Sequence, residues 1–134
     1  MSLVAVRIAL ETALAAISPA IALAYENHPY EPVNGTPYGR VYLLAAEPDN
    51  PEIGRFTQER GFLQVSLAYP LDTGPGPAAT QAEVIRAAFY RGRALTASGI
   101  TTTIERTPEI SPARIEDDRY VVPVRVRFFA NYVA

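Results

Sequence analysis

Residues 61–69 read Gly-Phe-Leu-Gln-Val-Ser-Leu-Ala-Tyr, and this stretch decides the fold. It is apolar and rich in residues that favour strands, and Pro70 closes it. A loop rich in proline and glycine follows at 70–77, and apolar side chains then recur at helical spacing. The order of strand, turn and helix predicts a central strand on which the rest of the chain packs.

The central strand has a polar, extended lead-in at 56–60. If both segments form one strand, it spans about 45 Å at ~3.3 Å per residue, which is longer than a typical strand. We therefore expect part of it, within 52–60, to project from the core as an arm or hairpin. Gly61 is the predicted bulge or bend, because glycine inside a strand often marks such a site.

Two segments have the apolar periodicity of helices. The first is rich in alanine and ends at Ser18-Pro19, and its apolar stripe comprises Leu3, Val6, Ile8, Leu10, Leu14 and Ile17. The second begins near Pro77, which suits the first turn of a helix. Its stripe comprises Ala82, Ile85, Phe89 and Gly92. We expect both stripes to face the core.

Further segments read as strands at 21–25, 40–46, 101–106 and 119–132. In the last, apolar residues alternate from Tyr120 to Phe128, while Pro123 lies on the opposite face. Because Pro123 cannot donate a backbone hydrogen bond, it predicts an edge position or a bulge. Together the segments predict an α+β fold in one domain, residues 1–134. We expect a single mixed, mainly antiparallel sheet of about five strands with two helices packed on one face.

Composition excludes several classes of protein. The 134 residues carry a net charge of −2, which argues against binding nucleic acid through bulk positive charge. The chain has no cysteine for a disulfide or thiolate metal site, and no lysine for Schiff-base or P-loop chemistry. The apolar N-terminal run is interrupted by Arg7, Glu11 and Pro19, so we expect neither a signal peptide nor a membrane span.

Residues suited to catalysis are scarce. His28 is the only histidine, and it reads as a surface residue of a proline-rich loop rather than a base or a metal ligand. The nucleophile motif of serine hydrolases is missing from the sequence. We therefore expect no enzyme activity, no catalytic, cofactor-binding or metal-binding residue, and no cofactor.

Residues suited to protein contacts are more frequent. Tyr30 and Tyr38 lie in a long loop, where tyrosine offers a large contact area with a polar tip. The acidic run Glu116-Asp117-Asp118 fits a solvated turn best, with calcium binding or an interface as alternatives.

Two pairs of arginines form the basic clusters. Arg91 and Arg93 suit the C-terminus of a helix, where they complement the helix dipole. Arg125 and Arg127 share one face of the last strand. They fit a solvated face or a row of salt bridges between subunits about equally well, and a contact with nucleic acid less well.

A series of short motifs runs along the whole chain. Its members, in order, are Ala24-Tyr-Glu-Asn27, Pro29-Tyr30, Gly35-Thr-Pro-Tyr38, the stretch 61–70, the Gly74/Gly76 loop, Phe89-Tyr-Arg-Gly92 and Asp117-Asp-Arg-Tyr-Val-Val-Pro-Val-Arg-Val126. In order and spacing, rather than in any single motif, the series resembles the tail terminator-like proteins of long-tailed bacteriophages and prophages. This group is related to the minor tail protein that caps the tail tube.

The resemblance implies a structural protein without enzyme activity. Such proteins form a ring, typically of six subunits, that caps the tail tube, stops its polymerisation and joins the tail to the head. The implied partners are further copies of the chain, the tail-tube protein and the head–tail connector, and the subunit can be a monomer in solution. No membrane and no sequence-specific nucleic acid is implied, although genomic DNA can pass through the ring. The implied location is the bacterial host cytoplasm during assembly and then the virion tail.

A ring requires two different patches that meet on neighbouring subunits. We expect an acidic patch and a basic patch, with further contacts from the loop tyrosines and the projecting arm. The candidate interface residues are Tyr30, Tyr38, Arg55, Glu59, Arg60, Arg91, Arg93, Glu116, Asp117, Asp118, Arg125 and Arg127. The alternative interpretation is another phage neck or head–tail connector protein. A small cytoplasmic enzyme or ligand-binding domain is the least favoured.

Overall fold

The strands of the chain form one mixed sheet, which two helices accompany. The computed structural model describes residues 2–17, 21–26, 29–31, 35–48, 50, 53–72, 74–116 and 118–133. In chain order the elements are α1 (Ser2–Ala15), β1 (Ala22–Tyr25), β2 (Tyr38–Ala45), β3 (Phe56–Pro70), α2 (Gly76–Ala88), β4 (Ala94–Ala97), β5 (Ile100–Ile104), β6 (Glu109–Ile110), β7 (Arg114–Glu116) and β8 (Arg119–Val133). The sheet order is β1-β2-β3-β8-β5-β4, and β6 and β7 also pair with β8. The pair β1–β2 is parallel and the others are antiparallel, so the predicted α+β fold with a mixed sheet is confirmed.

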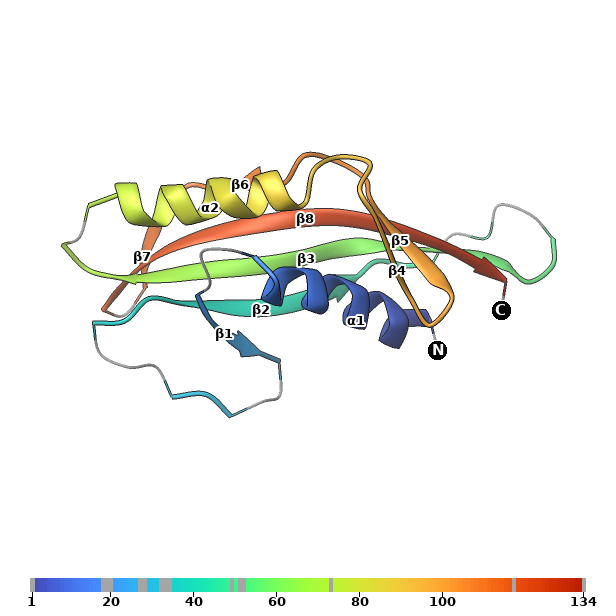
Figure 1. Ribbon diagram of the computed structural model, residues 1–134, viewed down its shortest axis with the longest axis horizontal. Helices are drawn as coiled ribbons and strands as arrows, with labels where there is room; N and C mark the ends of the chain where they lie inside the picture. Colours follow the sequence, from blue (N-terminus) through green and yellow to red (C-terminus); the bar gives the residue numbers. More distant parts are fainter. Residues whose placement is uncertain are drawn as a thin grey trace.

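Two long strands run side by side along the length of the molecule (Figure 1). β3 and β8 are each 15 residues long. Their register is continuous from Phe56↔Val133 to Pro70↔Arg119. The predicted continuation of 56–60 into the central strand is therefore confirmed, but a bulge at Gly61 is wrong. Of the predicted arm at 52–60, residue 52 lies outside the described residues, and 56–60 belong to β3, where β8 continues as a partner beyond the last β2 pair, Ala45↔Gly61.

Gly61 instead allows two backbones to approach closely. A Cβ atom at this position would overlap the carbonyl oxygen of Leu44 and lie 3.0 Å from the Cα atom of Ala45. Both are backbone atoms of β2, which cannot rotate out of the way. Glycine is needed here because β2 crosses close to β3 at its last pair.

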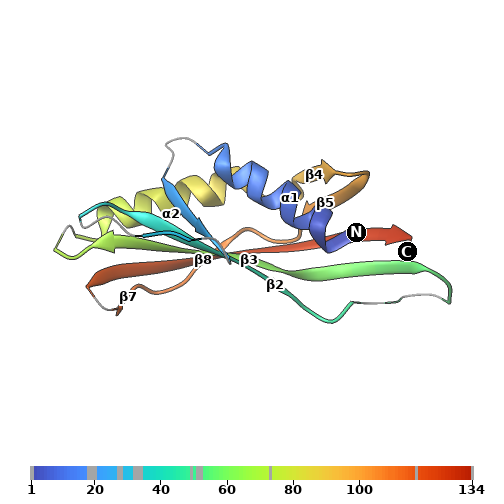
Figure 2. The same cartoon turned by 90° about the horizontal axis from the view of Figure 1, so that it is seen from below.

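One face of the sheet carries the hydrophobic core. The residues there are buried and alternate along both long strands; they include Leu63, Val65 and Leu67 of β3 and Val122, Val124, Val126 and Phe128 of β8. The helices add Val6, Leu10 and Leu14 from α1 and Ala78, Ala82, Ile85 and Phe89 from α2. Both helices lie on this same side of the sheet (Figure 2). The predicted core face of the last strand is therefore confirmed.

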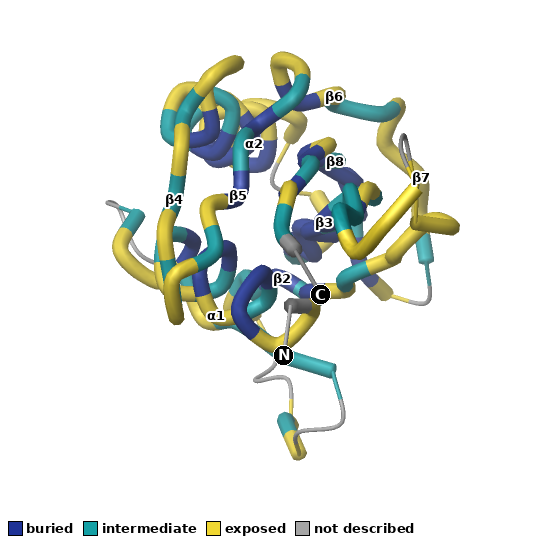
Figure 3. Tube along the Cα trace, turned by 90° about the vertical axis from the view of Figure 1, so that its right-hand side faces the viewer, coloured by how far each residue is buried: buried dark blue, intermediate teal, exposed yellow. Residues whose placement is uncertain are grey.

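The sheet curls around its core when viewed along the long axis (Figure 3). α1 contacts β3, β4 and β5, whereas α2 contacts β3 and β8. Within the described residues the sheet has eight strands, so the predicted number of about five is wrong. β4 is the first strand of a hairpin whose two-residue turn, Ser98-Gly99, has positive φ values of 50° and 77°. β6 and β7 are only two and three residues long, too short for a periodic pattern.

α1 departs from its predicted stripe. Leu3 and Ile8 are 41% and 47% exposed, whereas Ala5 and Ala9 are buried. Small alanines let this helix lie close to its neighbours. Because apolar residues occur all around α1, periodicity alone does not identify the side that faces the core.

Pro123 lies where no strand pairs continuously with β8 on the side away from β3. The amide of Ser111 donates to the Pro123 carbonyl at 2.9 Å. Proline has no N–H to return that bond, and β6 ends one residue earlier, at Ile110. β8 is nevertheless an interior strand, so the predicted edge position is wrong, and the β3–β8 register shows no bulge there. The missing N–H is tolerated because Pro123 lies between the residues that pair with β6 and those that pair with β7.

Candidate interaction surface

The face of the sheet opposite the helices is rich in arginine and aromatic residues. It consists of the residues that alternate with the core positions: Tyr38, Arg40, Tyr42 and Leu44 of β2, Phe62, Gln64 and Ser66 of β3, and Pro123, Arg125 and Arg127 of β8. We call this the outer sheet face. The register places Phe62 between Leu44 and Arg127, so side chains from three strands meet there.

Arg125 and Arg127 share one aromatic ring. Their guanidinium carbons lie 5.2 and 6.0 Å from the centroid of Phe62. Nε of Arg125 also donates to Oε1 of Gln64 at 3.2 Å. Each cation–π contact at an exposed site contributes roughly 0.5–1 kcal/mol. Because a guanidinium has five N–H donors, both arginines can still bind an anionic group of a partner.

A groove of about 520 Å³ adjoins this cluster. Leu44 and Phe62 form its apolar part, and Arg60 and Arg127 form its basic part. Glu105 also lines it and forms an ion pair with Arg60 at 3.8 Å. The structure thus brings together Arg60 of the arm and Arg127 of the last strand, two residues that are far apart in sequence.

The arginines after α2 have separate roles. Arg93 donates to the carbonyl oxygen of Ala88 at 2.6 Å and lies 6.0 Å from the ring centroid of Phe89. It therefore satisfies a carbonyl at the C-terminus of α2, as predicted for a basic residue there. Arg91 is exposed and lines a recess with Glu105 and Arg106, beside the groove.

Glu116 is already paired within the subunit. Its carboxylate lies 3.0 Å from Nη2 of Arg40 and 3.0 Å from Nε of Arg114. The hydrogen bond and charge of Arg40, followed by those of Arg114, hold the pKa of Glu116 below its ordinary value. Asp118 is exposed, and Asp117 lies outside the described residues.

Tyr30 and Tyr38 form a stack, and Tyr38, although predicted to lie in the loop, is the first residue of β2. Their ring centroids are 5.2 Å apart at an interplanar angle of 29°. Arg119 contacts Tyr38, with its guanidinium carbon 5.3 Å from the centroid of the ring. Its guanidinium also donates a hydrogen bond to the Thr36 carbonyl at 2.6 Å. Both tyrosines, Tyr30 and Tyr38, are half-buried. The stack ties the loop before β2 to the start of β8 and leaves part of each ring available for a partner.

The arm residues differ in exposure. Arg55 is exposed and Arg60 keeps 48% of its side chain exposed. Glu59 is only 6% exposed, because it points to the core side of β3. Its carboxylate accepts a hydrogen bond from the Tyr132 hydroxyl at 3.1 Å. Within the subunit Glu59 therefore joins β3 to β8 rather than lying on the surface.

Sequence reasoning missed several residues of the outer sheet face. The face and its border depend on an ion pair of Arg40, the aromatic ring of Phe62 and an ion pair of Glu105. These three residues lie in segments without a distinctive motif. The alternation of Phe62 with Leu63 indicates opposite faces. Their partners depend on strand register, which a single sequence does not specify.

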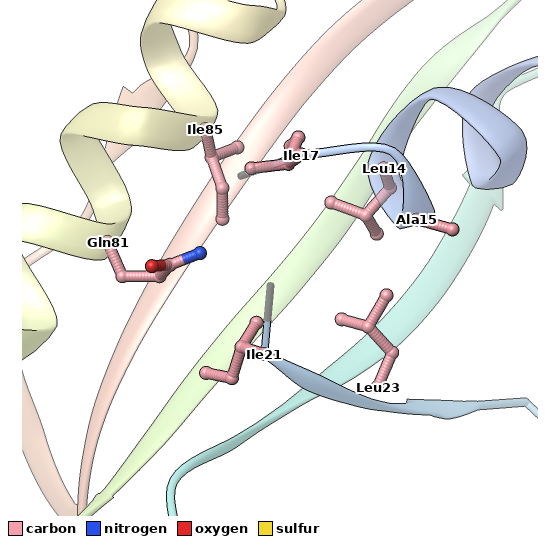
Figure 4. A pocket seen from close by; sticks show the side chains of 7 residues that line it. All are labelled: Leu14, Ala15, Ile17, Ile21, Leu23, Gln81 and Ile85. Carbon is pink, nitrogen blue, oxygen red and sulfur yellow. The ribbon is translucent and has the colours of Figure 1, made fainter. Parts of the chain in front are cut away.

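The cavity between α1, β1 and α2 is small (Figure 4). Leu14, Ile21 and Ile85 are among its apolar lining residues, and the Gln81 side chain points into it. Its volume of about 20 Å³ accommodates a single water molecule rather than a metabolite.

Within the described ranges, no three His, Cys, Asp or Glu side chains are grouped closely enough to hold a metal ion. His28 lies outside the described residues. Of the helices that the structure describes, none is long and apolar enough to cross a membrane.

Known proteins similar to this chain point to one family. Residues 5–128 match the family model described as phage tail terminator protein. A solved structure that carries no functional name aligns with a TM-score of 0.77 at 22% identity, covering 96% of this chain and 95% of that chain. At this identity the likeness shows a shared fold. No curated protein matches the chain.

Proposed function

Since the chain belongs to the phage tail terminator family and so has a structural role in the phage tail, we propose that it caps the tail tube as a ring of identical subunits. The ring ends tube polymerisation and provides the surface that joins the tail to the head. The observation that carries this proposal is the family match, which spans residues 5–128. The ring has no enzymatic task.

The outer sheet face supports an assembly role. A ring needs a heterologous contact, in which one patch of a subunit meets a different patch of the next. Arg125 and Arg127 are held over Phe62 and retain free donors, so they suit the basic side of such a contact. Asp118 and the half-buried tyrosines are candidates for other contacts. Glu116 is less available, because Arg40 and Arg114 already neutralise it.

Tube capping by the purified protein tests the proposal. The tail-tube protein of the same phage is polymerised with and without this chain, and tube length and tube ends are examined by electron microscopy. We expect shorter tubes with a ring at one end, and native mass spectrometry should show a closed oligomer at high protein concentration. Tubes of unchanged length without rings at their ends would contradict the proposal. Binding to the connector without any effect on the tube would favour a different neck protein.

A double charge reversal tests the basic patch. Arg125→Glu with Arg127→Glu is expected to abolish rings and tube capping, because two attractive contacts become repulsive. The matched control is Glu83→Arg, which reverses a charge on α2 at a side chain that is 65% exposed. If the double variant caps tubes as well as the control does, these arginines are not part of the ring contact.

A further inference from the structure

The outward side of α1 carries three exposed apolar side chains. Leu3, Val4 and Ile8 are 41%, 53% and 47% exposed, whereas Val6 and Leu10 on the inward side are fully buried. Half-buried Arg7 and Glu11 and exposed Thr12 lie on the same outward side. Exposed apolar side chains grouped among polar ones mark an interaction site. In the subunit the outward side of α1 faces solvent, as the exposed stretches of α1 in Figure 3 show. Something in the assembly is therefore expected to cover it.

The flank of α1 carries an excess of negative charge. Nη1 of Arg7 lies 3.2 Å from Glu11 and 3.2 Å from Glu26. One arginine thus serves two carboxylates, and both carboxylates are partly exposed, at 24% and 35% of their side chains. Oε1 of Glu26 also accepts a hydrogen bond from the Leu43 amide at 2.7 Å, so its second oxygen and the Glu11 carboxylate are the acceptors that remain for a partner.

The outer sheet face offers a complementary surface. Tyr42 and Leu44 are 37% and 45% exposed, and Leu44 shares the groove with Phe62. Arg125 and Arg127 border this apolar strip on the β8 side. An apolar centre with a basic border matches the apolar side of α1 with its acidic flank.

These two surfaces lie on opposite sides of the sheet. The inward residues of α1 pack on the same core as Val41 and Leu43 of β2. Tyr42 and Leu44 alternate with those residues and therefore point away from α1. One subunit cannot bring the two surfaces together, but two copies can, in a head-to-tail contact.

We propose that the outward side of α1 docks into the groove of the outer sheet face of a second copy of this chain. Leu3, Val4 and Ile8 cover Tyr42, Leu44 and Phe62, while Glu11 and Glu26 meet Arg125 and Arg127. The inference deepens the proposed ring, on which it rests, by naming the two surfaces that meet. It commits to a second copy because this chain carries both halves of the contact.

Cysteine cross-linking tests the contact directly, because the natural chain has no cysteine. Ile8→Cys protein and Leu44→Cys protein, one of them with a short tag, are mixed at high concentration under mild oxidation. The control mixture pairs Leu44→Cys with Ile115→Cys, an apolar position that is 70% exposed on β7. We expect the first mixture to cross-link at least about tenfold faster, because docked thiols react as an intramolecular pair. Equal rates in the two mixtures overturn the inference.

Complementation tests the head-to-tail geometry. Ile8→Glu damages only the α1 side, and Arg127→Glu damages only the groove side. Each alone is expected to weaken self-association at least about tenfold, or about 1.4 kcal/mol. A mixture of the two retains one intact contact and should give a 1:1 dimer that cannot grow, visible by native mass spectrometry. Both positions are exposed, so unchanged melting temperatures of the isolated variants verify that the fold is intact.

The outcomes separate this inference from the proposed function. If both variants form rings and cap tubes like the natural protein, the inference is wrong and the capping function stands. If cross-links form as expected but the natural protein never caps tubes, the surfaces are right and the function is wrong. If Ile8→Glu forms rings but no longer binds the tube, the tail-tube protein covers α1 and the inference is overturned.

Discussion

Replacing Gly61 by alanine is expected to destabilise the fold where β2 and β3 come closest. The added methyl group would overlap the carbonyl oxygen of Leu44 and approach the Cα atom of Ala45 at 3.0 Å. Because these are backbone atoms, relief requires moving the end of β2 away from β3. Overpacking of this kind costs about 1–3 kcal/mol. Replacing glycine also reduces the conformational entropy of the unfolded chain, which stabilises the folded state by about 0.4–1 kcal/mol. The net loss in free energy of unfolding is therefore expected to be roughly 1–2 kcal/mol.

Gly39→Ala provides a matched control in the same pair of strands. A Cβ atom at Gly39 would meet side-chain carbons, Val65 Cγ1 at 3.2 Å and Leu23 Cδ2 at 3.3 Å. These methyl groups can shift, so the two effects of the substitution should nearly cancel. Urea titrations followed by circular dichroism, at a protein concentration that keeps the chain monomeric, give the free energy of unfolding for both variants.

Hydrogen exchange adds a local measurement to the same experiment. The Ala46 amide donates to the Arg60 carbonyl at 2.8 Å, just beyond the last β2–β3 pair. This bond should open more readily in Gly61→Ala than in Gly39→Ala. The reasoning is refuted if Gly61→Ala is as stable as the natural protein and the Ala46 amide exchanges at the natural rate.

Two further substitutions have defined expectations. Phe128→Ala empties a fully buried core position and should cost about 3–5 kcal/mol in the same urea titration; a loss well under 1 kcal/mol would mean that the site is not packed as described. Glu116→Gln removes the carboxylate that Arg40 and Arg114 hold at a lowered pKa. A carboxylate whose pKa is lower in the folded than in the unfolded state stabilises the fold at pH values above the ordinary pKa of 4.5. This stabilisation is lost as the pH falls through the lowered pKa. The natural protein should therefore be more stable than Glu116→Gln at neutral pH and equally stable in acid. The pair is partly exposed, so that advantage is below about 1 kcal/mol at neutral pH, and melting temperatures of both proteins from neutral to acidic pH measure it. A gap that persists at the acid end would contradict the assignment.

The long elements of the fold could be predicted because each carries its own periodic signal. β8 alternates from Val124 to Ala130, since one side packs on the core and the other lies outward, whereas both sides are buried at the start of the strand. α2 likewise shows its buried stripe through Ala78, Ala82 and Ile85. In both elements the pattern reflects a one-sided environment. Long segments of this kind average over many residues, so the sequence specifies their type without knowledge of their neighbours.

Three short strands, β4, β6 and β7, could not be predicted, because their pairing depends on neighbouring strands and turns. β6 and β7 contain too few residues to alternate, and each exists only where β8 offers free backbone groups. β4 depends on the turn at Ser98-Gly99, in which a serine adopts positive φ. Serine is not a strong signal for that conformation. The sequence therefore gives no clear sign of a hairpin centred on this turn.

The candidate surface was predictable only in part for the same reason. Arg125 and Arg127 could be placed on one face, because their spacing of two residues requires it. The stacking of both on Phe62 depends on the β3–β8 register, and a shift by one residue would move Phe62 to the core side. The internal pairing of Glu116 with Arg40 depends in addition on the position of β7. Contacts between strands are thus the information that a single sequence lacks.

The contacts on the outer sheet face also bear on how assembly can be controlled. An arginine that is free in the subunit carries about 2 kcal/mol of rotamer entropy, which is partly lost when a partner fixes it. Arg125 is already restrained by Phe62 and Gln64, so less of that entropy remains to be lost on docking. The apolar side of α1 is a rigid helical surface and likewise needs little ordering. Each contact between subunits would then be modest in area yet specific in geometry. Closure of the proposed ring would add the last contact without a further loss of translational freedom, because the two subunits that meet already belong to one assembly. Under the proposed function, such a subunit would remain monomeric when dilute and assemble where a tail-tube end raises its local concentration.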